Sequence, residues 1–214
     1  MATKTSGAES VKQISYLAGA LKAPRISDAA TRLADQARDA GWSFEDYLAA
    51  VLEREVSARN ASGAQLRIRA AGFPGRKTLE DFDWDTQAGI RPQIAALASG
   101  GFLTEARNVV LLGPPGTGKT HLAISLALLA CQQGRRVRFT TLAALANELQ
   151  AAESRRELGR VIARYARTEL VVLDELGYLA LLEGAAELVF QVISERNERA
   201  SLIVTETIYL THLP

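Results

Sequence analysis

Hydrophobic positions recur with two different periodicities along the chain, and the periodicity changes near residue 73. Before that point, apolar residues recur every three or four positions, which predicts amphipathic helices. Ser43 and Asp46 have the spacing of a capping pair at the start of one of these helices. After it, short apolar runs alternate with helical segments, as is typical of a parallel sheet with helices on both faces. The expected strands are residues 109–112, 136–140, 170–173 and 202–205.

The two periodicities also predict how the chain is divided into domains. The first part is a small all-α domain, too short to be an enzyme by itself, and the second is an α/β core. Between them, Phe73, Pro74 and Gly75 should end the preceding helix. The expected parts are a disordered tail at 1–9, a helical domain at 10–72, a linker at 73–90 and the core at 91–214. Phe82 and Trp84 in the acidic linker indicate packing onto the core, with contact near an adenine ring as the sharper interpretation.

The segment after the first expected strand fits the phosphate-loop pattern G-x-x-x-x-G-K-(S/T), and a helix-forming stretch follows it. Its glycines allow consecutive backbone N–H groups to face nucleotide phosphates, and the helix N-terminus adds partial positive charge. Lys119 is expected at the β- and γ-phosphates, and the Thr120 hydroxyl is expected to ligate Mg²⁺. The predicted ATP-binding residues are Gly113, Pro114, Pro115, Gly116, Thr117, Gly118, Lys119, Thr120 and His121. As a lone histidine, His121 is more typical of a packing residue than of a metal ligand.

A second pair of candidate residues follows the third expected strand. Asp174 and Glu175 stand directly after the apolar run at 170–173. In phosphate-loop NTPases a carboxylate in this place holds Mg²⁺, which we assign to Asp174. Glu175 can then act as the general base that orients the attacking water. A solvated acidic turn is the alternative, but the preceding phosphate loop favours a metal and catalytic role.

Composition narrows the class of protein further. Hydrophobic residues make up 48% of the 214, enough for a core of domain size, and the net charge of +1 does not by itself indicate a nucleic-acid partner. The single cysteine, Cys131, cannot form an internal disulfide, which suits a reducing compartment. No apolar run approaches the ~18 residues of a membrane span, and no signal-peptide pattern opens the chain. We therefore expect a soluble, cytoplasmic protein with no membrane partner.

The nearly neutral total conceals one strongly basic stretch. Residues 59–77 contain five basic side chains and no acidic one. Such a stretch can contact DNA phosphates, although basic helix faces are more often merely solvated. The candidate DNA-binding residues are Arg59, Arg67, Arg69, Arg76 and Lys77.

Taken together, these motifs resemble those of the IstB family, the helper ATPases of a group of bacterial insertion sequences. The resemblance covers about residues 11–205 and is carried by residues 77–83, 113–123, 138–141, 173–178 and 190–196. The resemblance implies a phosphate-loop AAA+ fold. It also implies a protein that binds ATP, assembles as a homo-oligomer on duplex DNA and presents target DNA to a cognate transposase. DnaC-type helicase loaders are the alternative, but they match the linker and residues 173–178 less closely. A nucleotide kinase is a weaker third alternative, because no segment looks like its basic lid.

The sequence departs from the family pattern near its end. Where the family has a Ser-Asn pair whose asparagine senses the γ-phosphate, this chain has Glu206 and Thr207. A final strand next to residues 109–112, an arginine-finger segment and the helical lid would follow Pro214, so we expect a C-terminally truncated core without the lid. An arginine finger is worth ~10³ to 10⁵ in rate. A nucleotide-binding remnant with weak hydrolysis is therefore the alternative to an active ATPase.

Overall fold

The computed structural model describes residues 7–85, 87–176 and 184–208. The chain forms two compact units, Met1–Gly63 and Ala64–Pro214. The division falls inside the helix α3 (Phe44–Ala71), earlier than the boundary expected at residue 72, because the last two turns of this helix belong to the core of the second unit. Residues 177 and 178 of the family-like stretch 173–178 lie outside the described residues, as do 1–6 and 209–214.

The first unit contains α1 (Gly7–Ala20), α2 (Pro24–Ala40) and the first part of α3. Residues 7–9, expected in a disordered tail, are helical, and Glu9 favours this start because an acidic side chain complements a helix N-terminus. The capping pair expected at the start of α3 is present, with the Asp46 N–H donating to Ser43 Oγ at 3.0 Å. The buried side chains of this unit's core include Ala29, Ala30, Leu33 and Val51.

The second unit is an α/β domain, as the alternation of apolar runs and helical segments predicted. Its elements are the 3₁₀ turn η1 (Ala88–Ile90), α4 (Arg91–Ala98), α5 (Gly101–Thr104), β1 (Val109–Gly113), α6 (Lys119–Gln132), β2 (Val137–Thr141), α7 (Leu142–Ser154), α8 (Leu158–Ala166), β3 (Leu170–Asp174), α9 (Ala185–Arg196) and β4 (Ser201–Thr207).

The four strands form one parallel sheet in the order β1-β4-β3-β2. β4 comes last along the chain but lies between β1 and β3. Leu111 of β1 is in register with Thr205 of β4, and Leu173 of β3 is in register with Val204. Because the strands are parallel, their carboxyl ends meet at one edge of the sheet, which is where ligands bind in open α/β sheets.

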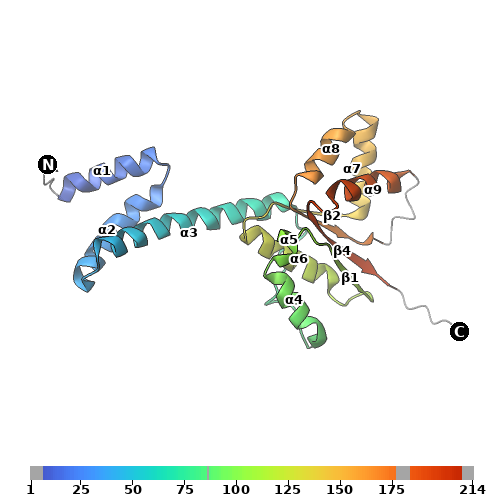
Figure 1. Cartoon of the computed structure of the whole chain (residues 1–214), viewed down its shortest axis with the longest axis horizontal. Helices are drawn as coiled ribbons and strands as arrows, with labels where there is room; N and C mark the ends of the chain where they lie inside the picture. Colours follow the sequence, from blue (N-terminus) through green and yellow to red (C-terminus); the bar gives the residue numbers. More distant parts are fainter. Residues whose placement is uncertain (1–6, 86, 177–183, 209–214) are drawn as a thin grey trace. The chain divides into compact units, whose positions relative to one another are not determined.

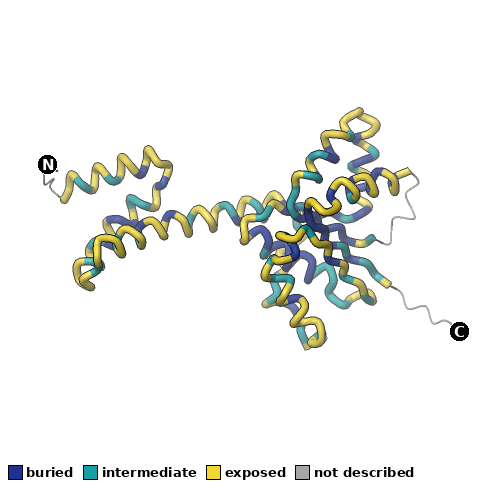
Figure 2. Tube along the Cα trace, viewed as in Figure 1, coloured by how far each residue is buried: buried dark blue, intermediate teal, exposed yellow. Residues whose placement is uncertain are grey.

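Helices cover the two faces of this sheet (Figure 1), with α4, α5 and α6 on one side and α7, α8 and α9 on the other. β3 alternates between the two layers: Leu170 and Val172 pack with the α6 layer, whereas Val171 and Leu173 pack with the α7–α9 layer. All four side chains are fully buried, and Figure 2 shows the sheet interior as the most buried part of this unit. Burial on both faces explains why the strand reads as a continuous apolar run.

β1 pairs with β4 and is the end strand of the sheet within the described residues. Val109 is buried, but Val110 and Leu112 are each 57% exposed.

Within the described residues, no helix combines the length and the apolar composition needed to cross a membrane.

A fully buried arginine joins three parts of the second unit. Arg196, at the end of α9, is 1% exposed. Its guanidinium donates hydrogen bonds to the carbonyl oxygens of Tyr165, of Thr168 at 2.7 Å and of Ser201 at 2.7 Å. Burial lowers the pKa of Arg196 to about 10, so the side chain remains charged at neutral pH. It therefore fastens the ends of α8 and α9 to the start of β4.

Candidate nucleotide site

The phosphate-loop motif forms the turn between β1 and α6. Gly116 and Gly118 have φ of +77° and +83°, a left-handed conformation that favours glycine. A Cβ on Gly118 would also lie 2.5 Å from the Phe82 ring, so this glycine is required twice over. Gly113 differs from the expectation, because its φ is not in the left-handed region, and a Cβ there would meet Thr117 Oγ1 at 3.4 Å. The curl of the loop therefore depends on Gly116 and Gly118.

Lys119 lies at the first position of α6, and its side chain folds back over the loop. Its Nζ donates to the carbonyl oxygens of Gly113 at 3.0 Å and Pro114 at 2.7 Å. Thr117 Oγ1 also donates to the Pro114 carbonyl, at 2.9 Å. The ammonium group thus lies over the loop at the N-terminus of α6, where helix N–H groups favour an anion.

The structure brings Thr120 and Asp174 together, 54 positions apart along the chain. Thr120 Oγ1 donates to Asp174 Oδ1 at 2.8 Å, and the Asp174 side chain is buried. Glu175 is exposed and has a left-handed backbone with φ of +62°. All three residues lie at the carboxyl-end edge of the sheet, beside the phosphate loop.

This pair suits the magnesium ion that the fold implies. A hydroxyl and a carboxylate oxygen already within hydrogen-bond distance are the hard oxygen ligands that Mg²⁺ prefers. Among the described residues, no group of three or more His, Cys, Asp or Glu side chains gathers around a common point. Thr120 and Asp174 would therefore supply two oxygen ligands to such an ion, and its other ligands would come from outside this pair.

The linker packs onto the phosphate loop through its aromatic residues. Phe82 is buried, touches Gly118 and meets the His121 ring edge-to-face at 5.3 Å between centroids. His121 Nε2 lies 2.7 Å from the Thr78 carbonyl oxygen. Trp84 packs against Phe82 at 4.7 Å, and the Arg91 guanidinium lies 5.5 Å from the Trp84 ring. His121 therefore contacts the linker, and the expected packing of both aromatics onto the core is confirmed.

The five basic residues of the stretch 59–77 lie in different environments. Arg59 bonds to Glu55 at 2.5 Å and to the Lys22 carbonyl oxygen at 2.6 Å within the first unit. In the second unit, Arg67 Nε donates to the Cys131 carbonyl oxygen at 2.8 Å. Arg59 and Arg67 are therefore each engaged in bonds inside their own unit.

The other three basic residues remain exposed. Arg69 and Arg76 line one pocket of about 250 Å³ with Phe73 and Gln132, and Lys77 is exposed beside it. Among the described residues, neither Arg69 nor Arg76 forms an ion pair with an acidic side chain. This pocket is the part of the basic stretch that remains open to an anion.

Cys131 lies in the buried layer behind this pocket. Its side chain is fully buried, and burial raises the pKa of the thiol to about 11. The group therefore stays protonated at neutral pH and lacks the thiolate that a nucleophilic cysteine needs.

The sequence patterns did not identify Thr205 as a site residue. Its hydroxyl donates to Asp174 Oδ1 at 2.5 Å and accepts from the Glu175 N–H at 3.0 Å. The only signal in the sequence is a hydroxyl residue inside an apolar strand. Glu206 and Thr207, at the places of the family's Ser-Asn pair, are in register with Leu112 and Gly113 at the start of the phosphate loop.

Comparison with known sequences gives a consistent set of relatives. The family described as IstB-like ATP binding protein matches residues 16–213. An insertion-sequence IS21 protein of Pseudomonas aeruginosa, described as ATP-binding, is 36% identical over 90% of this chain and 73% of its own length. Its counterpart in insertion sequence IS5376 of Geobacillus stearothermophilus is 33% identical, over 86% of this chain and 74% of its own.

Solved structures show the same fold at lower identity. DnaA of Aquifex aeolicus bound to AMPPCP has a TM-score of 0.53 and 22% identity, covering 60% of this chain and 41% of that one. The DnaC helicase loader also has a TM-score of 0.53 and 22% identity, covering 68% of this chain and 81% of its own. The second unit thus has the phosphate-loop AAA+ fold, with a four-stranded parallel sheet in the described residues.

Proposed function

The chain belongs to the family of IstB-like ATP-binding proteins, and from this premise we propose that it is an ATP-dependent helper of DNA transposition. In this proposal it binds Mg²⁺-ATP, assembles as a homo-oligomer on duplex DNA and presents target DNA to a cognate transposase. The observation that carries the ATP-dependent part is the meeting of Lys119, Thr120 and Asp174 at one sheet edge. The insertion-sequence origin of the relatives supports the transposition part.

The site residues divide the work as follows. Lys119 exchanges the carbonyl oxygens of Gly113 and Pro114 for the β- and γ-phosphate oxygens of the nucleotide. Thr120 and Asp174 would hold Mg²⁺, which supplies positive charge to the phosphates when bound. Glu175 accepts the proton of the attacking water as general base. Phe82 keeps the linker packed against the phosphate loop, so that nucleotide binding at the loop can change the position of the linker.

The first test is ATP turnover with and without duplex DNA, in wild type and in Glu175→Gln. The variant should keep its ATP affinity within about twofold, while turnover falls roughly 10²- to 10⁴-fold because an amide cannot accept the proton. Glu198→Gln is the matched control, since Glu198 is also exposed and left-handed, with φ of +59°. Undiminished turnover in Glu175→Gln would remove Glu175 as the base. Wild-type turnover no higher than the rate measured without protein would instead favour the nucleotide-binding remnant.

For the DNA contact we propose the pocket of Arg69 and Arg76, with Lys77 beside it. These cations are exposed and unpaired among the described residues, whereas Arg59 and Arg67 are committed to internal hydrogen bonds. The pocket therefore narrows the candidate DNA-binding residues from five to three.

Replacing Arg69 and Arg76 together by alanine should weaken binding to duplex DNA similarly for all sequences. The slope of log affinity against log salt concentration should flatten by about 0.9 for each DNA phosphate that the variant no longer neutralises. Arg67→Ala is the control, because it should lower thermal stability and leave this slope unchanged. The measurement is fluorescence anisotropy with labelled duplexes at several salt concentrations.

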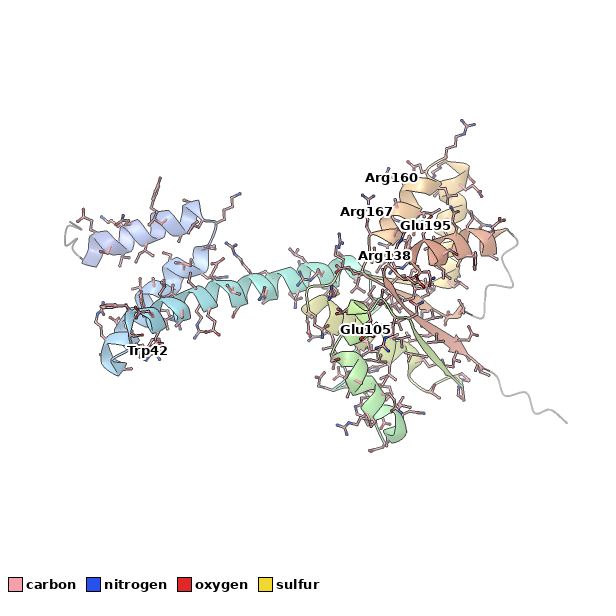
Figure 3. All side chains as sticks on the ribbon, in the orientation of Figure 1. Trp42, Glu105, Arg138, Arg160, Arg167 and Glu195 are labelled. Carbon is pink, nitrogen blue, oxygen red and sulfur yellow. The ribbon has the colours of Figure 1, made fainter. Side chains whose placement is uncertain are left out.

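A different result would relocate the DNA contact. Arg160 of α8 and Arg167, the residue directly after α8, are labelled near Arg138 in Figure 3, and the Arg160 side chain is 82% exposed. If Arg160→Ala with Arg167→Ala flattens the salt slope and the Arg69 and Arg76 pair does not, the proposal for the pocket is wrong. The DNA would then contact α8.

A further inference from the structure

We infer that Thr205 is a positioning residue for Asp174 and Glu175, acting on both through its single hydroxyl group. The inference rests on the proposed ATP hydrolysis at this site and adds a residue that no sequence motif marks. Thr205 belongs to β4, the strand between the phosphate-loop strand β1 and the Asp174 strand β3. Its side chain is 2% exposed.

The Thr205 hydroxyl uses both of its hydrogen-bonding functions on the site. It donates to Asp174 Oδ1 at 2.5 Å and accepts from the backbone N–H of Glu175 at 3.0 Å. A buried threonine commonly bonds instead to a nearby backbone carbonyl, as Thr140 of β2 does with the Thr141 carbonyl oxygen at 3.1 Å. Both partners of Thr205 lie about 30 positions away along the chain, and both are site residues.

The first consequence concerns the orientation of the Asp174 carboxylate. Thr120 and Thr205 both donate to Oδ1, at 2.8 Å and 2.5 Å. Two donors on one oxygen fix the rotation of the carboxylate. No hydrogen bond within the described residues occupies Oδ2, so this oxygen is left for another ligand. If Thr120 turns toward a ligand of its own, Thr205 still holds Asp174.

The second consequence concerns the direction of Glu175. Its φ of +62° lies in the left-handed region, which is unfavourable for a residue with a side chain. The hydrogen bond from the Glu175 N–H to Thr205 stabilises this conformation. The left-handed turn sets the direction in which the Glu175 side chain leaves β3, and Thr205 therefore ties that direction to β4.

The test compares Thr205→Val with Thr205→Ser in the full chain. Valine keeps the shape of threonine and removes the hydroxyl, whereas serine keeps the hydroxyl and removes a methyl group. We expect Thr205→Val to lower kcat at least about tenfold while its Kd for ATP stays within about twofold. Amide hydrogen exchange should become faster at Glu175 and stay unchanged at Val171 and Val172 of the same strand. Thr205→Ser should retain most of the wild-type kcat and the slow exchange at Glu175.

Other outcomes would overturn the inference. If the two variants lose turnover equally, the methyl packing matters and the hydroxyl does not. Wild-type kcat and unchanged Glu175 exchange in Thr205→Val would also overturn it. Failure of the proposed function is a separate outcome, namely wild-type turnover no higher than the rate measured without protein. In that case the positioning role is tested by hydrogen exchange at Glu175 alone, and unchanged exchange in Thr205→Val rejects it.

Discussion

Replacing Lys119 by alanine is expected to reduce ATP affinity by about 30-fold to several thousand-fold, the equivalent of about 2–5 kcal/mol. The Nζ atom already lies over the phosphate loop, within 3.0 Å of the Gly113 carbonyl oxygen. Without it, the β- and γ-phosphates keep the backbone N–H groups but lose the point charge that neutralises them. Isothermal titration calorimetry with ATP and Mg²⁺ measures the change directly.

Lys12→Ala is the control for Lys119→Ala, because Lys12 is an exposed lysine on α1 in the first unit. It should leave the ATP affinity unchanged. The thermal unfolding of Lys119→Ala should remain close to that of wild type, since the lysine is only half-buried and its bonds are to an exposed loop. Equal ATP affinity in wild type and Lys119→Ala would show that nucleotide does not bind at this loop.

Arg196→Met should lower the free energy of unfolding of the second unit by about 3–5 kcal/mol, because three carbonyl oxygens lose their donors at a cost of about 1–3 kcal/mol for each one left buried and unsatisfied. The substitution removes the donors that satisfy the carbonyl oxygens of Tyr165, Thr168 and Ser201 and leaves these oxygens beside an apolar side chain. In a chain of this size the midpoint of thermal unfolding should fall by roughly 6 to 20 °C. Circular dichroism during heating and urea titration would measure both quantities.

Arg199→Met provides the comparison, because Arg199 follows the same helix with a side chain that is 77% exposed. Its effect should stay within about 0.5 kcal/mol, as for most surface substitutions. If Arg196→Met unfolds at the same temperature as Arg199→Met, the three carbonyl oxygens must find other donors. The buried arginine would then contribute little to the junction of α8, α9 and β4.

The local chemistry of the site could be read from the sequence because it depends on residues close together along the chain. The phosphate loop needs glycine at two left-handed positions and a lysine at the start of a helix, all within eight residues. The continuous apolar run of β3 followed from burial on both faces of a parallel sheet. The helical periodicity of the first unit and the capping pair at Ser43 are likewise local signals.

The partners of individual side chains were decided only by the tertiary structure. The basic stretch 59–77 reads as one charged segment, yet the fold separates Arg67, bonded to the Cys131 carbonyl oxygen, from Arg69 and Arg76 around an open pocket. The division between the two units likewise falls inside the continuous helix α3, because residues 64–71 pack within the second unit and no change of sequence pattern marks that point.

Strand order had the largest effect on the site. A run of apolar residues predicts a strand but not its neighbours, since every buried strand presents the same backbone hydrogen-bonding groups. Only the assembled sheet places β4 between β1 and β3 and so brings Thr205 against Asp174 and Glu175. The sequence by itself predicted the candidate nucleotide-binding residues, because the phosphate-loop pattern depends on local backbone geometry and charge. The tertiary structure decided which distant hydroxyl holds the carboxylate pair, because that contact depends on strand order.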